Sequence, residues 1–146
     1  MVTSDDDRVV EAGSEFLEHE ADVGIRAWGR TLEEAYEKTA WAVADLLGVR
    51  GEGPGTHRTI RLTGTDEAEI LVHFLNELLL LHETEGPGFA AIHVLHVARN
   101  ELEAEIELVP LDDAPEGIPV KAATFHRLGV ELRPDGWIEA RVYLDV

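Results

Sequence analysis

The sequence predicts an α+β two-layer sandwich, with a mostly antiparallel sheet of about six strands and two main helices. Two segments carry apolar residues at helical spacing, and shorter segments with strand patterning lie between and after them. The last strands follow one another through short turns, as in antiparallel hairpins. The 146 residues fit one domain, in which residues 1–13 form a disordered acidic tail and residues 14–146 fold.

The first half of the chain contains a long strand segment, a helix and a second strand. A strand is expected over residues 16–28, with an interruption at residues 19–22. The first helix begins at a capping box, Thr-Leu-Glu-Glu at residues 31–34, because its threonine and second glutamate can satisfy free backbone N–H groups. Gly48 ends this helix. A strand at residues 57–62 follows.

The second half begins with the longer helix. Asp66 is its N-cap, and the helix runs to about Glu83 with a wide apolar face. An Arg-Pro-Asp-Gly turn at residues 133–136 joins the last two strands. The remaining strands are expected at residues 90–98, 102–108, 120–132 and 136–146.

The charge balance is strongly acidic. The formal net charge is −18, and only two of the 12 basic residues are lysines. An acidic surface repels phosphate, so direct binding to nucleic acid is not expected. This balance suits a protein that works in concentrated salt, where the Debye length falls to about 3 Å at 1 M. A GC-rich genome, which also favours arginine, is the alternative explanation.

Several functional classes are excluded by composition. The chain has no cysteine, which excludes disulfides, thiolate catalysis and zinc–sulfur sites. No run of about 18 apolar residues is present, so no membrane-spanning segment or membrane partner is expected. The N-terminus is acidic rather than basic and then apolar, unlike a signal peptide. We therefore expect a cytoplasmic protein.

Asp22, Asp145 and the terminal carboxylate of Val146 are the candidate metal ligands. Asp145 alternates with the apolar residues of the last strand and so points away from the core. Together with Asp22 and the chain end, it forms an all-oxygen set that suits Ca²⁺ or Mg²⁺ better than zinc. Spacing alone leaves an alternative: Asp22 caps a turn and Asp145 is merely solvated.

His126 and Lys121 stand out in the strand at residues 120–132. His126 alternates with apolar residues, so it is expected on the core side as a hydrogen-bonded histidine. Lys121 faces the other way and is one of only two lysines in the chain, which suggests a retained task.

Two further pairs of residues have suggestive spacing. His73 and Glu77 lie one helical turn apart and are expected to form an ordinary surface pair. His93 and His96 are expected on opposite faces of their strand, so a chelate there would need a bulge and is not expected.

Four separated segments resemble the archease family. They cover the chain from about residue 16 to its end, in the family's order and spacing. The segments are residues 19–29 (His-Glu-Ala-Asp-Val-Gly-Ile-Arg-Ala-Trp-Gly), 74–81 (Phe-Leu-Asn-Glu-Leu-Leu-Leu-Leu), 121–126 (Lys-Ala-Ala-Thr-Phe-His) and 140–146 (Ala-Arg-Val-Tyr-Leu-Asp-Val).

The resemblance implies a small α+β protein with no catalytic residues of its own. Archeases assist the GTP-dependent RNA-splicing ligase of the RtcB type, promoting its guanylylation and its multiple turnover in tRNA splicing. RNA is then contacted only through the ligase. The family's metal, usually calcium with Mg²⁺ or Mn²⁺ also conceivable, would be held by Asp22, Asp145 and the main-chain oxygen of Val146. Supporting or partner-contacting roles are expected for Lys121, His126 and Glu77.

Two departures from the family pattern affect these expectations. Glu20 replaces the usual threonine and adds a negative group beside the expected site, and Phe125 replaces a commoner tyrosine and removes a hydroxyl. Two other functions stay open. One is a metal-dependent phosphoesterase that uses the same carboxylates, with His126 as general acid–base. The other is a chaperone or modulator of other RNA-modifying enzymes.

Overall fold

The structure is a computed structural model that describes residues 11–19 and 22–146. The described residues form nine elements of secondary structure, seven strands and two helices. These are β1 (Gly13–His19), β2 (Asp22–Gly29), α1 (Leu32–Leu47), β3 (Thr56–Thr63), α2 (Glu67–Thr84), β4 (Gly88–Ala98), β5 (Glu101–Val109), β6 (Ala122–Leu132) and β7 (Ile138–Asp145).

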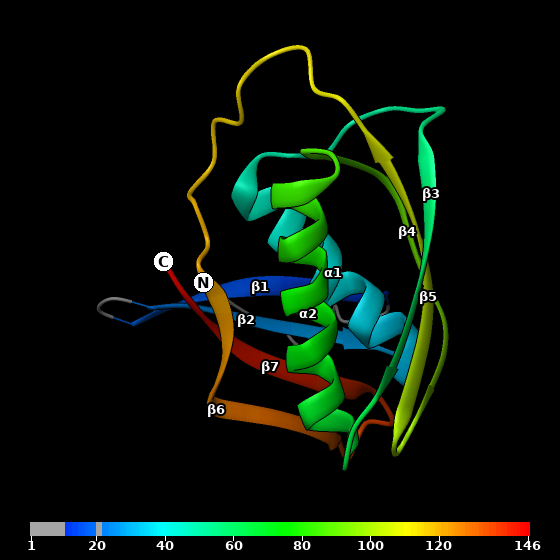
Figure 1. The fold of residues 1–146 in the computed structure, drawn as a ribbon. Coiled ribbons are helices and arrows are strands. Elements are labelled where there is room, and N and C mark those ends of the chain that lie inside the picture. The colour runs from blue at the N-terminus through cyan, green and yellow to red at the C-terminus, as the bar shows by residue number, and fades with distance from the viewer. Residues whose placement is uncertain (1–10, 20–21) are drawn as a thin grey trace.

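The strands form two antiparallel sheets that open like a wedge, and both helices lie in the angle between them (Figure 1). One sheet has the strand order β1-β2-β7-β6, and the other has the order β3-β5-β4. The α+β class, the antiparallel pairing and the two helices predicted from the sequence are confirmed. The strands are divided over two sheets, so the two sheets together can cover the apolar sides of both helices.

The interruption predicted near residues 19–22 separates two strands of a hairpin. β1 and β2 pair antiparallel from Gly13 opposite Trp28 to His19 opposite Asp22. The predicted acidic tail falls mostly on residues 1–10, which lie outside the described residues. β1 begins at Gly13, three residues before the expected start of this strand at residue 16.

Both helices begin at their predicted N-caps, and α1 ends at its predicted Gly48, while α2 ends at Thr84, one residue beyond the expected end near Glu83. The Thr31 hydroxyl accepts a hydrogen bond from the Glu34 backbone N–H, and the Asp66 carboxylate accepts one from Glu69. Gly48 adopts the left-handed conformation after α1, with φ of 72°, which an L side chain rarely adopts.

One continuous core fills the space between the helices and the two sheets. It is built by large side chains from every layer, including Ile25, Tyr36, Phe74, Phe89 and Ile106, all nearly or completely buried. Complete burial of side chains of this size contributes about 1.5–3 kcal/mol each.

A wide bulge interrupts β6. Thr124 pairs with Tyr143, but the next pair is Gly129 with Arg141, so residues 125–128 stand opposite Val142 alone. The expectation that His126 lies on the core side is therefore wrong: its side chain is exposed. Strict alternation fails here because the chain leaves the ladder within the strand.

A second bulge, in β4, overturns the expectation for its two histidines. The register shifts between Val94 and His96, so His93 pairs with Glu105 and His96 pairs with Glu103. The two glutamates are two residues apart on β5 and share a face, so both histidines lie on that same outer face. The His96 ring lies 3.0 Å from the Glu101 carboxylate.

In the ranges that the structure describes, neither helix is long and apolar enough to cross a membrane.

Candidate metal site

Asp22 and Asp145 lie directly opposite each other on adjacent strands. Asp22 begins β2, Asp145 ends β7, and the two pair in the antiparallel ladder between these strands. Residues opposite each other project to the same face, with Cβ atoms about 4.5–5.5 Å apart. The fold thus brings together two acidic residues that are separated by almost the whole chain, as the sequence predicts.

The backbone hydrogen bond of Asp145 shows whether Asp22 and Asp145 form a hydrogen-bonded or a non-hydrogen-bonded pair of the antiparallel ladder. The Asp145 carbonyl accepts a hydrogen bond of 2.8 Å from the Lys121 N–H, so it faces β6 and not β2. Asp22 and Asp145 therefore form a pair without mutual backbone hydrogen bonds, the type in which side chains approach more closely.

The donor chemistry of this pair fits a hard divalent cation. Both side chains are half-buried, and their oxygens are the ligands that Ca²⁺ and Mg²⁺ prefer. Among the described ion pairs, neither carboxylate contacts an arginine, lysine or histidine. Two carboxylates held opposite each other repel, and a cation between them would remove that cost.

A third ligand would have to come from outside the described acidic and imidazole side chains. Over residues 11–19 and 22–146, no group of three or more His, Cys, Asp or Glu side chains is arranged to hold a metal ion. The third expected ligand, the main-chain oxygen of Val146, directly follows Asp145, while the Val146 side chain packs against the core. Glu20 lies outside the described residues.

Tyr143 and Gly24 lie next to the pair of Asp22 and Asp145 on the outer face of the sheet. They are the next pair along the same face of the ladder, and Tyr143 is only 6% exposed. A Cβ on Gly24 would lie 2.8 Å from the Tyr143 ring, so glycine at this position leaves room for the ring next to β2. The glycine of the opening motif thus fixes a ring next to Asp22 and Asp145.

The β6 bulge covers the other side of this ring. The His126 ring meets Tyr143 edge-on at 6.0 Å between centroids, and the Arg127 guanidinium lies 5.9 Å from the same ring. Arg127 has φ of 54°, an uncommon conformation for a residue other than glycine. His126 therefore lies on the same outer face as the acidic pair, although the sequence placed it in the core.

Lys121 and Asn76 hold the start of β6 in place. Lys121 is exposed, and its backbone N–H binds Asp145 as described above. On the far side of β6, the Asn76 amide accepts a hydrogen bond from the Ala123 N–H at 2.8 Å and donates one to the Ala123 carbonyl at 3.2 Å. Sequence reasoning missed Asn76; its only signal was a polar residue within an otherwise apolar helix segment.

Glu77 belongs to a different surface. It lines a hollow between α2 and β3 whose lining residues do not include Asp22 or Asp145. His73 was expected to pair with Glu77, but its ion-pair partner in the structure is Glu69, whose carboxylate lies 4.0 Å from the His73 ring. His73 also meets the Phe125 ring edge-on at 6.3 Å.

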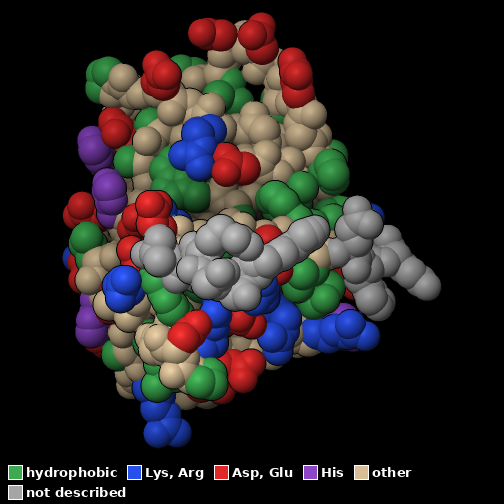
Figure 2. All heavy atoms as spheres, turned by 180° about the vertical axis from the view of Figure 1, so that it is seen from behind, with side chains coloured by type: hydrophobic (Ala, Val, Ile, Leu, Met, Phe, Trp, Pro, Cys, Tyr) green, Lys and Arg blue, Asp and Glu red, His purple; other side chains and the backbone are tan. Residues whose placement is uncertain are grey.

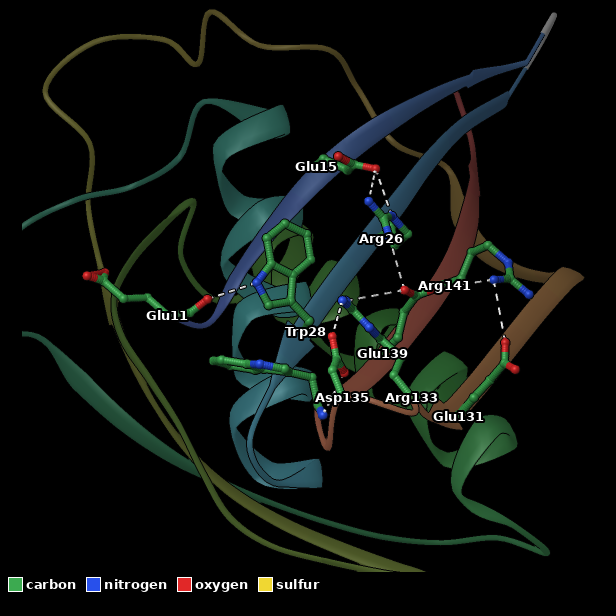
Figure 3. Close-up of polar contacts among 10 residues, drawn as sticks. Glu11, Glu15, Arg26, Trp28, Glu131, Arg133, Asp135, Glu139 and Arg141 are labelled. Carbon is green, nitrogen blue, oxygen red and sulfur yellow. Dashed lines mark hydrogen bonds and ion pairs between the residues drawn. The ribbon is translucent and has the colours of Figure 1, made fainter. Parts of the chain in front are cut away.

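Farther along the same outer face, arginines surround one carboxylate (Figure 3). Glu139 lies 3.1 Å from Arg26, 3.4 Å from Arg141 and 3.7 Å from Arg133. Partial burial acts to lower the pKa of Arg26, but its hydrogen bonds to Glu15 and Glu139 outweigh this and raise it. These arginines form their ion pairs with Glu15, Glu139 and other acids of this network, and not with the Asp22 and Asp145 carboxylates.

Viewed from behind, basic side chains gather on the lower part of the molecule, with acidic ones among them, while acidic side chains line the top (Figure 2). On this face, basic side chains therefore gather in one region, although the chain carries a net charge of −18.

Comparisons with known proteins agree with the motifs. The model of the archease protein family matches residues 15–146. Protein archease of Methanosarcina acetivorans is 35% identical over 139 residues, covering 90% of this chain and 94% of that protein. Protein archease of Pyrococcus furiosus is 36% identical over 140 residues, covering 90% and 97%.

Two solved structures share the fold. The solution structure of Methanobacterium thermoautotrophicum protein 1598 has a TM-score of 0.75 and 29% identity, covering 92% of this chain and 99% of that one. The crystal structure of a Thermotoga maritima protein, described as an archease and possible chaperone, has a TM-score of 0.67 over 89% and 94% of the two chains. At 21% identity, the second likeness concerns the fold alone.

Proposed function

Because this chain belongs to the archease family, we propose that it is an accessory protein that activates a GTP-dependent RNA-splicing ligase of the RtcB type. In this role it promotes guanylylation of the ligase and its repeated turnover in tRNA splicing. The chain itself does not catalyse ligation, and it meets RNA only through the ligase.

The observation that carries this proposal is the pairing of Asp22 with Asp145. These are the two acidic positions that the family resemblance assigns to a metal, and the register of β2 and β7 supports their joint use. Asp22, Asp145 and the Val146 main-chain oxygen would hold a divalent cation, with Ca²⁺ as the first candidate because all the donors are oxygen. Such an ion would supply positive charge where the ligase and its nucleotide meet this surface.

The neighbouring residues suit a contact surface around the ion. Lys121 is exposed and tied through its backbone to Asp145, and His126 lies on the outer face against Tyr143. Both could touch the partner or a phosphate, whereas Glu77 would act on the separate surface beside β3.

The test is RNA ligation by the cognate ligase with GTP and RNA in excess over enzyme. Multiple turnovers are expected with the wild-type protein and not without it. Asp22→Asn and Asp145→Asn should each reduce the stimulation by at least tenfold. Asp113→Asn is the matched control, because it removes the same charge from an exposed position in the loop before β6 and should stimulate like the wild type.

Each other result has a defined meaning. Full stimulation by all the variants would keep the ligase partnership and remove the metal from it. No stimulation by the wild type would overturn the proposal. Hydrolysis of a generic phosphodiester by the protein alone, lost in Asp22→Asn, would favour the phosphoesterase alternative.

A further inference from the structure

The fold closes two of its four sheet edges with side chains. At the edge of β4, Glu37 accepts a hydrogen bond from the Val94 N–H at 3.0 Å, and Glu33 accepts one from the Val97 N–H at 2.9 Å. At the edge of β6, the Asn76 amide occupies both backbone groups of Ala123. Such covers prevent an edge strand from pairing with another chain.

The edge of β3 is covered only at its start, where the Arg58 guanidinium donates to the His57 carbonyl at 2.9 Å, among the residues that the structure describes. Gly64 donates its N–H to Asn100 of the β4–β5 turn, so by alternation the backbone groups of Thr59, Arg61 and Thr63 point away from β5. Within the part of the chain that the structure describes, no hydrogen bond reaches these outward backbone groups. Figure 1 shows β3 as the outermost strand of its sheet, beside α2.

A hollow lies along this edge. Residues 61–63 form one wall, and a helical stripe of α2 that includes His73, Glu77 and Leu80 forms the other. Leu80 is 50% exposed although it lies on a helix that otherwise buries its leucines. An added strand could thus bond to the β3 backbone and place alternate apolar side chains against Leu80 and Leu62.

The charges of β3 select the partner. Its eight residues contain Arg58, Arg61 and a histidine but no acid, in a chain with 30 acidic residues. Arg58 is bonded to the Glu85 carboxylate at the end of α2, so Arg61 is the arginine that a partner would meet. The Arg61 side chain is 75% exposed and reaches Glu103 at 3.3 Å through one nitrogen, so it retains further donors for a second carboxylate. A second copy of β3 paired about Arg61 would place two Arg61 side chains opposite each other, which disfavours that register of self-pairing.

We propose that β3 is a docking edge for an extended acidic segment of another protein, which adds a fourth strand to the sheet beside α2. Acidic side chains on the segment would face Arg61, and alternate apolar ones would enter the hollow. Apart from Glu77, which lines the same hollow, this inference is independent of the proposed ligase activation.

Binding of a capped, fluorescein-labelled eight-residue peptide of alternating Glu and Val tests the proposal, measured by fluorescence anisotropy. The peptide should bind at least fivefold more tightly than one of alternating Lys and Val. Thr59→Pro should abolish binding, because its ring blocks strand addition while the lost N–H faces away from β5. Arg61→Glu should weaken binding about fivefold, by changing an opposite-charge pair into a like-charge pair. Lys38→Glu, an equal change of charge on α1, should bind like the wild type.

Backbone amide exchange provides a second readout that does not depend on Thr59→Pro folding. In the wild type, the peptide should slow exchange of the Thr59, Arg61 and Thr63 amides. Equal binding of the two peptides, equal binding by Arg61→Glu, or unchanged exchange at these amides would overturn the proposal. Concentration-dependent dimerisation of the wild type, lost in Thr59→Pro, would also overturn it, by assigning the edge to a second copy.

Discussion

Asn76 on α2 makes two hydrogen bonds to the backbone of Ala123, so a helix side chain occupies the place of a neighbouring strand at the edge of β6. The preceding residue of β6, Ala122, pairs with Asp145 at the end of β7. The helix therefore positions the strand that flanks one side of the candidate metal site.

Asn76→Asp should destabilise the protein by about 1–3 kcal/mol, because a carboxylate cannot donate to the Ala123 carbonyl and leaves it unpaired. Urea unfolding at neutral pH measures the change. Asn100→Asp, with the same change of charge at an exposed turn position, should alter stability by less than about 0.5 kcal/mol. Equal effects of the two substitutions would show that charge, and not the paired hydrogen bonds, is responsible.

Calcium should stabilise the wild type against heat. At a free concentration of about 100 times the dissociation constant, a ligand of the folded state adds about 2.7 kcal/mol. Asp22→Asn should remove this gain while making the metal-free protein slightly more stable, because it ends the repulsion with Asp145. Thermal unfolding in calcium and in chelator measures both effects.

Asp113→Asn is again the control and should keep the full calcium response. A calcium response of the same size in Asp22→Asn and the wild type would place the bound ion elsewhere.

Local signals in the sequence were sufficient for the helices. Thr31, Gly48 and Asp66 act on backbone groups within a few residues, so their positions predict the helix ends directly. The approach of Asp22 to Asp145 was expected from the family resemblance, which pairs Asp22 with the chain end, whereas residue spacing alone left open that Asp22 caps a turn and Asp145 is solvated.

The bulges could not be predicted in this way. His126 and His96 sit in segments whose alternation looks regular, and only the pairing with β7 and β5 reveals the extra residues. The same limit applies to Asn76, whose role depends on a strand 47 residues away. Register is a property of two segments together, so a rule that examines one segment at a time misses it.

Tyr36 should make stability depend on alkaline pH. Its side chain is fully buried and its hydroxyl donates to the Glu67 carbonyl at 2.6 Å. Burial raises the pKa of Tyr36, and the nearby Glu67 and Asp66 carboxylates raise it further. The unfolded chain ionises this phenol near its ordinary pKa of about 10, whereas the folded protein keeps it neutral. The contribution is therefore complete below about pH 10 and is lost as the pH rises through and above that value.

Tyr36→Phe isolates this contribution. At pH 7 the variant should be less stable by about 1 kcal/mol, from loss of the hydrogen bond. The difference should shrink above about pH 10, where only the wild type loses stability through this group. Denaturant unfolding at pH 7 and pH 10.5 measures it, and a difference that stayed constant would contradict the prediction.

Glu139 should stabilise the outer face more than any exposed acid around it. Its side chain is 13% exposed and lies within 4 Å of Arg26, Arg133 and Arg141, so removing its charge leaves three cations facing one another. Glu139→Gln should cost about 1–2 kcal/mol in dilute buffer, a range that allows for the partial exposure of the arginines. Glu131→Gln is the matched control, because Glu131 is 63% exposed and, among the described ion pairs, meets only Arg141, at 3.8 Å. The cost of Glu131→Gln should stay below about 0.5 kcal/mol. In 1 M salt the Debye length falls to about 3 Å, which weakens the repulsion among the arginines, so the cost of Glu139→Gln should decrease. A cost that is equal in both variants, or that grows with salt, would mean that the three arginines do not depend on Glu139 for their stability.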